Sequence, residues 1–197
     1  VGTQCLANLK QLGIGSQLYV DAHRALPGQN FFGINGKAWD DSAMYGGIAE
    51  YVGYSEYVFG KNTVFTCPFA ARTRPYLDEW WPMRRNYAIS PRAMSLDSDN
   101  MPYAYSTPLP QIRRPGGMLL MADTMIFTPS HGKEYPATYL PNVGTALTGY
   151  LTGISLMHGN RIQLLYVDGH ASAMSMAEFA GLNNFTIGSG LVFWKGY

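Results

Sequence analysis

Two histidines and two aspartates could in principle bind a divalent metal ion. His158, Asp168 and His170 lie close together near the end of the chain, and Asp123 lies further upstream. Imidazole nitrogens and carboxylate oxygens are common metal ligands. A structural interpretation competes with this one: Asp168 and Gly169 suit a turn, His170 starts the strand that follows, and Asp123 ends a strand. We favour the structural interpretation and assign no metal or cofactor from these residues.

His158 has no turn to explain it. We expect its side chain to bond the backbone or Asp168, as a structural latch and not as a general base. Hydrolytic chemistry has little support, because Ser130, His131 and Ser155 belong to neither a Gly-x-Ser-x-Gly elbow nor a His-Glu-x-x-His helix. The sequence therefore predicts a protein that is not an enzyme; a metal-dependent hydrolase using His158 and Asp168 is the weaker alternative.

The chain has two cysteines, Cys5 and Cys67. In a protein of the cell envelope they could form one disulfide, which would tie the start of the chain to a distant loop. Alternatively, both could be buried free thiols. The sequence does not decide between them, because bridging depends on the distance between the two Cα atoms.

Aromatic and arginine side chains are concentrated in the middle of the chain. Such side chains are enriched in binding hot spots, and aromatic faces also stack on sugars. The cluster is a candidate recognition surface for a partner or a glycan, or else it packs a loop onto the core. Its members are Tyr76, Trp80, Trp81, Arg84, Arg85 and Tyr87.

Residues 5–24 form the only long segment with helical periodicity. Cys5, Leu9 and Leu12 fall on the face predicted to be buried, whereas Gln17 falls on the opposite face. Glycines in a helix interior cost about 1 kcal/mol each relative to alanine, so packing must hold this helix; Gly13 and Gly15 would let a strand approach closely. A stop is expected at residues 25–28, which contain proline and glycine.

Strands are expected mainly in the second half of the chain. Residues 118–123 are apolar throughout, which predicts a central strand buried on both faces. Residues 161–167 and 170–174 flank Asp168-Gly169, which predicts a hairpin with a type I′ turn. Shorter strands are expected at 64–68, 85–90 and 185–197, and short helices at 42–52 and 176–182. Residues 69–110 and 124–152 are expected to be irregular.

The composition favours a single α+β domain. The chain has 197 residues, only 14% of them charged, and a net charge of +1, so nothing indicates a nucleic-acid surface or a polybasic membrane patch. We divide it into a helix at 1–26, a variable, loop-rich middle at 27–110, and a sheet region at 111–197. A helix, an irregular middle and antiparallel strands in that order are typical of an α+β fold.

Several separated motifs resemble bacterial prepilin-type proteins. Residues 5–13, Cys-Leu-Ala-Asn-Leu-Lys-Gln-Leu-Gly, are similar to the segment that follows their membrane helix, with Ala7 in place of an asparagine. Cys67-Pro68 resembles their later Cys-Pro element. Most specifically, His158 is followed by nine residues and then Asp168-Gly169, with Asn160 in between, which matches their His-x9-Asp-Gly signature.

This resemblance implies a type IV pilin or type II secretion pseudopilin-like fold, in which an N-terminal helix packs on an antiparallel sheet. It further implies a non-catalytic subunit on the periplasmic or extracellular side of the bacterial envelope, anchored by a hydrophobic segment upstream of Val1. Its partners would be other pilin-like subunits or secretion-apparatus proteins. Secretion pseudopilins suggest calcium, but no dense acidic loop supplies ligands here. The alternative function is an envelope carbohydrate- or ligand-binding module on the same scaffold.

Overall fold

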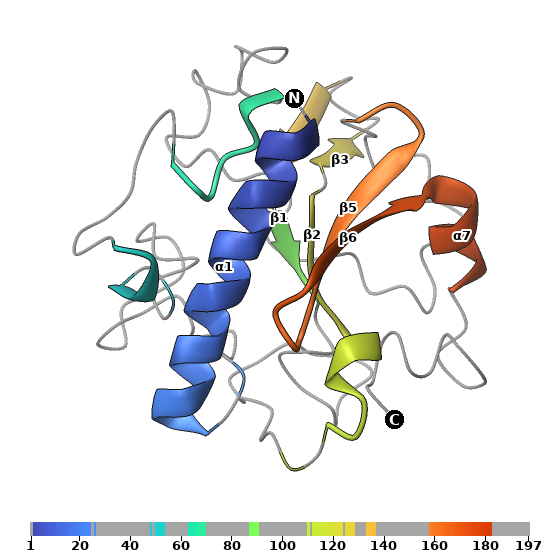
Figure 1. Ribbon diagram of the computed structural model, residues 1–197. Helices are drawn as coiled ribbons and strands as arrows, with labels where there is room; N and C mark the ends of the chain where they lie inside the picture. The colour runs from blue at the N-terminus through green and yellow to red at the C-terminus, as the bar shows by residue number, and fades with distance from the viewer. Residues whose placement is uncertain are drawn as a thin grey trace.

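The computed structural model describes residues 2–24, 26, 48, 50–53, 63–69, 87–90, 110, 112–123, 125–128, 133–136 and 158–182. Within these ranges the fold is α+β: an N-terminal helix, α1, lies against an antiparallel sheet (Figure 1). Side chains of the helix, the sheet and residues 63–69 share one apolar cluster. No helix in the described part of the chain is long and apolar enough to cross a membrane.

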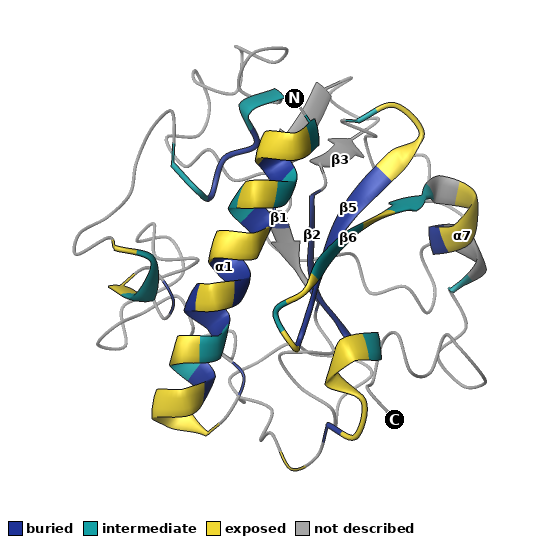
Figure 2. Ribbon diagram, in the orientation of Figure 1, coloured by how far each residue is buried: buried dark blue, intermediate teal, exposed yellow. Residues whose placement is uncertain are grey.

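Helix α1 spans Gly2–His23 and buries one face along most of its length (Figure 2). The predicted face is confirmed for Cys5, Leu9 and Leu12, which are fully buried. The placement of Gln17 was wrong: this side chain is partly buried and its Nε2 donates to the backbone oxygen of Val167. The predicted outward face therefore contains one residue that contacts the sheet region.

The end of α1 differs from the stop predicted at the proline. The helix ends at His23, and Arg24 takes a positive φ of 60° while its N–H still donates to the Val20 oxygen at 2.7 Å. A residue in the left-handed region is a common helix terminator. Leu26 follows and is completely buried. The chain thus leaves the helix before Pro27 can act as a breaker.

The main sheet has the strand order β1-β2-β5-β6, with every neighbouring pair antiparallel. Its strands are β1 (Tyr87–Ile89), β2 (Leu119–Asp123), β5 (Arg161–Tyr166) and β6 (Ala171–Ser175). All five residues of β2 are buried and the strand lies between β1 and β5, which confirms the prediction for 118–123. The strand predicted within 85–90 is confirmed by β1.

The predicted hairpin at Asp168-Gly169 is confirmed, but its turn type was wrong. Strands β5 and β6 pair through Leu165 and Ala171, and the Tyr166 N–H donates to the His170 oxygen at 2.9 Å. The loop therefore has three residues, with Gly169 at φ 87°. A type I′ turn needs positive φ at both central residues, but Arg24 is the only non-glycine with positive φ in the described ranges.

Two other strand and loop predictions were wrong. Within 124–152, predicted to be irregular, β3 (Met125–Thr128) and β4 (Lys133–Pro136) pair as an antiparallel hairpin. Residues 64–68 do not form a strand: the Thr66 N–H donates to the Thr63 oxygen and closes a turn. This turn carries Cys67 toward α1, an orientation that depends on long-range contacts and not on β propensity.

Short helical segments complete the described chain. Helix α7 (Met176–Gly181) confirms the prediction for 176–182 and buries Phe179 against the sheet. Of the helix predicted at 42–52, the structure describes Ile48 and a short 3₁₀ segment, η2 (Glu50–Val52). Another 3₁₀ segment, η4 (Pro115–Gly117), precedes β2. The strand predicted at 185–197 lies outside the described residues.

Candidate functional site

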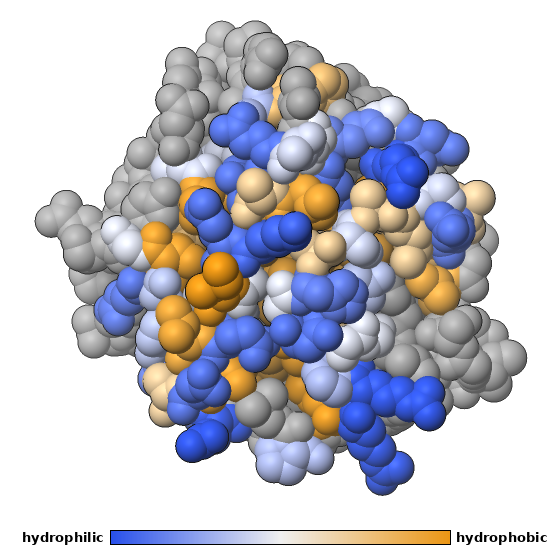
Figure 3. All heavy atoms as spheres, viewed as in Figure 1, coloured by the Kyte–Doolittle hydropathy of each residue, from blue (hydrophilic) through white to orange (hydrophobic). Residues whose placement is uncertain are grey.

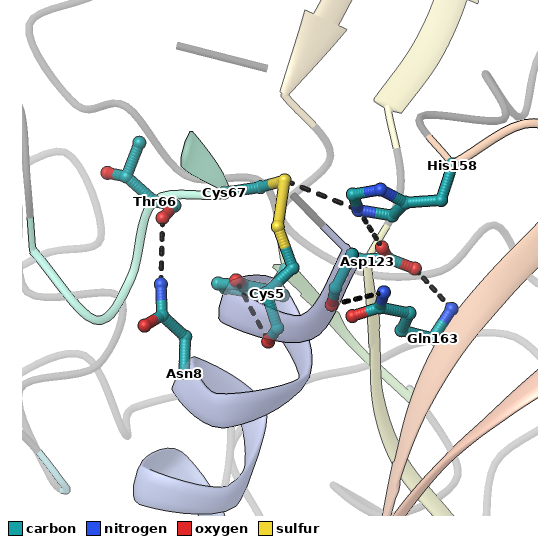
Figure 4. Close-up of polar contacts among 9 residues, drawn as sticks. Cys5, Asn8, Thr66, Cys67, Asp123, His158 and Gln163 are labelled. Carbon is teal, nitrogen blue, oxygen red and sulfur yellow. Dashed lines mark hydrogen bonds and ion pairs between the residues drawn. A yellow bond between two sulfur atoms is a disulfide. The ribbon is translucent and has the colours of Figure 1, made fainter. Parts of the chain in front are cut away.

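Four polar or sulfur-containing side chains, three of them buried and one partly buried, meet where the start of α1 approaches the end of β2 and the segment leading into β5 (Figure 4). We call this group, formed by Cys5, Cys67, Asp123 and His158, the Cys–Asp–His cluster. Two of its members had been considered as metal ligands together with Asp168 and His170. The structure instead gathers residues from four separate parts of the sequence.

The two cysteines are joined by a disulfide, with their Cα atoms 5.3 Å apart. Both side chains are completely buried. Next to the bond, Asn8 Nδ2 donates to the Thr66 oxygen at 3.0 Å, one turn further along α1. This second contact holds residues 63–69 against α1 independently of the covalent link.

Asp123 ends β2 but lies inside the protein, with only 3% of its surface exposed. The antiparallel register brings it beside β5, where the Gln163 N–H donates to Oδ1 at 2.5 Å. Burial raises the pKa of Asp123 to about 6, while the hydrogen bonds from His158 and Gln163 act in the opposite direction. Asp123 does end a strand, as predicted, but the strand-end position does not account for its buried carboxyl group or its contacts with His158 and Gln163.

The expected partners of His158 were the backbone or Asp168, but among the described residues its polar contacts are with Asp123 and Cys67. Its Nε2 lies 3.0 Å from Asp123 Oδ2 and 3.5 Å from Cys67 Sγ, and its ring packs near Phe69, with the ring centres 5.6 Å apart. The carboxylate can only accept, so Nε2 carries the proton in this arrangement. Gly159 then turns the chain into β5 with φ 70°.

Gln163 supports the cluster and was missed in the sequence. Besides its backbone bond to Asp123, its Nε2 donates to the Gly2 oxygen at 2.8 Å, which links β5 to the first turn of α1. The side chain is buried within the apolar run of β5. A glutamine among buried apolar residues was the available signal, since buried polar groups need partners.

Asp168 and His170 form a second, separate pair at the β5–β6 hairpin. Asp168 Oδ1 accepts from His170 Nδ1 at 2.6 Å and from the His170 backbone N–H at 3.1 Å, and both side chains are substantially exposed. The imidazole stacks on Tyr166, with ring centres 4.1 Å apart. The candidate metal ligands thus fall into two distinct pairs. Asn160, the other residue of the motif, is exposed ahead of β5.

The hairpin loop touches α1 directly. A methyl group built on Gly13 would lie 2.7 Å from the Gly169 backbone oxygen and 2.8 Å from Leu165 Cδ1. Only a residue without a side chain allows this approach. One turn later, Gln17 Nε2 lies 2.5 Å from the Val167 oxygen. The close approach expected at Gly13 is confirmed, and Gly15 packs in the same way against Ile48 and Val52.

Tyr87 does not belong to an exposed recognition surface. Tyr87 is completely buried under α1, with its hydroxyl 3.4 Å from the Cys5 backbone oxygen. It serves the core and cannot contact a ligand. The other five members, Tyr76, Trp80, Trp81, Arg84 and Arg85, lie outside the described residues, as do Ser130, His131 and Ser155.

The geometry of the Cys–Asp–His cluster does not match a nucleophilic triad. In such a triad the carboxylate holds one imidazole nitrogen while the nucleophile faces the other. Here the carboxylate and the sulfur both approach Nε2 of His158. The ring therefore cannot pass a proton from sulfur to one nitrogen while the carboxylate orients the other.

Comparison of the chain with protein-family models, with curated proteins and with solved structures finds no match.

Proposed function

We propose that this protein is a non-catalytic, pseudopilin-like subunit of a type IV pilus or type II secretion-like assembly at the bacterial cell envelope. The observation that carries the proposal is the contact between Gly13 and Gly169. These residues belong to the two motifs on which the resemblance rests, the helix segment at 5–13 and the His-x9-Asp-Gly signature. The two motifs are far apart in the sequence but pack on each other, and this contact supports the proposal that they belong to one pilin-like fold.

The outer face of α1 supports a role in assembly. Ile14 is 61% exposed and Leu18 is 45% exposed, and residues four apart on a helix are neighbours on its surface. The face of the molecule that presents α1 carries apolar patches among hydrophilic side chains (Figure 3). An apolar pair on a helix that is otherwise well packed suits contact with the helix of another pilin-like subunit.

The chemistry of the described residues agrees with a structural role. The Asp–His pair of the Cys–Asp–His cluster is directed at a disulfide and not at an exposed nucleophile. The carbohydrate-binding alternative gains no support from the described part of the chain, where Tyr87 is buried. We therefore propose one function, with assembly as its work and pilin-like subunits as its partners.

The test is to replace the apolar pair in the full-length protein in its native host. In Ile14→Asp and Leu18→Asp, we expect the loss of crosslinks between this subunit and itself or other pilin-like subunits, with unchanged thermal unfolding of the purified domain. Gln4→Asp, exposed on the same helix but about 15 Å from Ile14 along its axis, is the matched control. Undiminished crosslinking in both variants, or a gene without a hydrophobic segment and prepilin cleavage site upstream of Val1, would contradict the proposal.

A further inference from the structure

Once its disulfide is reduced, the Cys–Asp–His cluster offers four side chains of the types that bind zinc, three of them already grouped. Two thiolates, an imidazole and a carboxylate are all common ligands of Zn²⁺, which favours four of them in a tetrahedron. Such a set is unusual in a core, because each member alone is costly to bury in its charged form. We propose that reduction of the Cys5–Cys67 disulfide turns this cluster into a tetrahedral Zn²⁺ site. This inference is independent of the assembly function.

Two distances from His158 are close to those of a tetrahedral site. With metal–ligand bonds of about 2.0 to 2.3 Å, neighbouring ligand atoms lie about 3.3 to 3.8 Å apart. His158 Nε2 is 3.5 Å from Cys67 Sγ and 3.0 Å from Asp123 Oδ2. The ligand atoms of the two cysteines and His158 all lie within 4.8 Å of one another. A four-ligand site also requires the two sulfurs to separate and the Asp123 carboxylate, which lies outside this group of three, to turn toward them.

The carboxylate of Asp123 points into the site with spare capacity. Its Oδ1 is held by the Gln163 backbone, whereas Oδ2 has His158 as its sole partner among the residues described. A buried carboxylate normally gains several hydrogen bonds or a cation. Zn²⁺ would give Oδ2 the positive partner that the surrounding apolar core does not supply.

The surroundings keep the ligands together when the covalent bond is absent. Asn8 bonds Thr66 beside Cys67, Gln163 bonds Gly2 beside Cys5, and the Tyr87 hydroxyl bonds the Cys5 oxygen. Hydrogen bonds of this kind, one shell out from the ligands, orient metal sites and contribute to their affinity. Reduction therefore leaves two buried thiols close to each other and to the imidazole.

Zinc binding requires two chemical steps, reduction of the disulfide and then replacement of the thiol protons by the metal. A dithiol reductant passes two electrons and two protons to the disulfide, giving two cysteine thiols and its own disulfide. Zn²⁺ then displaces one proton from each thiol, giving two Zn–S bonds and two released protons. His158 moves its proton from Nε2 to Nδ1, which frees the Nε2 lone pair and releases no further proton. In the reverse direction, a small-molecule disulfide accepts two electrons and two protons and becomes two thiols, while both Zn–S bonds break, the protein disulfide re-forms and Zn²⁺ is released.

The test is zinc titration of the purified protein in both redox states. A phosphine reductant is used, because it takes up oxygen from water as it reduces the disulfide and competes little for zinc. We expect one equivalent of Zn²⁺ bound to the reduced protein and none to the oxidised protein, measured by elemental analysis after gel filtration. Co²⁺ in place of Zn²⁺ should give thiolate charge-transfer bands and the intense visible bands of a tetrahedral complex.

The second Asp–His pair gives matched control variants. His158→Gln and Asp123→Asn each remove a proposed zinc ligand. Changing a residue that only supports a ligand lowers metal affinity by about 10- to 100-fold, so these two variants should lose at least as much. His170→Gln and Asp168→Asn change the same residue types at the exposed pair and should leave zinc binding unchanged. Equal zinc affinity in all four variants, or no stoichiometric zinc on the reduced wild-type protein, would overturn the proposal.

Unfolding of the reduced chain is followed by far-ultraviolet circular dichroism in the same titration. If reduction alone unfolds the protein, zinc should restore the helical signal at one equivalent, because binding to a site present only in the folded state favours folding. A reduced protein that stays unfolded with excess zinc would count against the site. So would a Co²⁺ spectrum of octahedral type.

Discussion

Asp123 shows how one buried carboxyl group makes stability depend on pH. Its exposed fraction is 3%, and burial raises its pKa from 3.8 to about 6. A raised pKa means that the folded protein holds the proton more tightly than the unfolded chain. The stabilisation from this group is therefore fully present below about pH 4 and is lost as the pH rises through about 6. His158 and Gln163 are the polar neighbours that contact it from other segments, and His158 is the titratable one.

Asp123→Asn should remove this pH dependence. The free energy of unfolding of the wild-type protein should fall relative to the variant between pH 4 and pH 7, by on the order of 2 kcal/mol, because only the wild type must bury a charge at the higher pH. Urea unfolding of both proteins at several pH values measures the difference. Asp168→Asn, at the exposed pair, is the control, and a wild-type curve parallel to that of Asp123→Asn would contradict the prediction.

At the residue scale, the sequence identified the correct side chains and paired them incorrectly. His158 and Asp123 were both selected, but the partners expected for His158 were the backbone or Asp168, which is nearer along the chain than Asp123. The actual partner comes from β2, which the β2–β5 register places beside the start of β5. Such a pairing depends on strand order and register, which a single sequence does not specify. Gln163 did have a local signal, its place within an apolar run, but its partners Asp123 and Gly2 depend on the same long-range geometry.

At the scale of elements, the contact between α1 and the β5–β6 hairpin is set by Gly13. Replacing a glycine inside a helix by alanine usually gains about 1 kcal/mol. Gly13→Ala should instead destabilise the protein by about 1–3 kcal/mol, since the new methyl group would meet the Gly169 oxygen at 2.7 Å and Leu165 at 2.8 Å. Chemical denaturation measures the change.

Gln11→Ala on the exposed side of α1 serves as the control for that substitution and should alter stability by less than about 0.5 kcal/mol. A stabilising Gly13→Ala would mean that the helix and the hairpin can separate at low cost. Gln17→Ala, which removes the bond to Val167, tests the same contact from the next turn.

Elements with a strong local pattern were predicted correctly, whereas turns and helix ends were not. The periodicity of α1 and the apolar run of β2 reflect burial that each segment achieves along its whole length. The turn between β5 and β6 depends on one additional loop residue, Val167, whose apolar side chain made it look like part of the strand. The end of α1 depends on a left-handed Arg24, a residue type that rarely adopts that conformation.

At the scale of the whole molecule, the disulfide is the strongest single constraint. It spans a sequence separation of 62 residues, and closing a loop of that length removes entropy from the unfolded chain worth about 4 kcal/mol. Cys67→Ser should therefore lower the free energy of unfolding by about this amount in buffer containing a chelator. Cys5→Ser should have the same effect, since either change breaks the bond.

The double variant provides the control for this prediction. Cys5→Ser combined with Cys67→Ser should be no less stable than either single variant, because the disulfide can be lost only once. Additive losses in the double variant would show that each cysteine stabilises the protein through its own packing and not through the bond.

The α+β class followed from the order of patterns along the chain, and the structure confirms it. A helix at the start and antiparallel strands in the second half leave few other arrangements. The sequence did not decide between a disulfide and two free thiols. The disulfide depends on the path of residues 63–69, which form a turn where a strand had been predicted. Long-range geometry of this kind arises from the folded core and has no local signature.

The covalent link between residues 5 and 67 also determines what a protease would produce. A single cut at any peptide bond between these positions leaves two pieces that remain one molecule until the sulfur bridge is opened. Such a nicked protein would migrate as one band on a non-reducing gel and as two bands after reduction. Helix α1, although it ends at His23, would remain attached to the sheet through the contacts of Gly13 and Gln17 after the backbone beyond it had been cut.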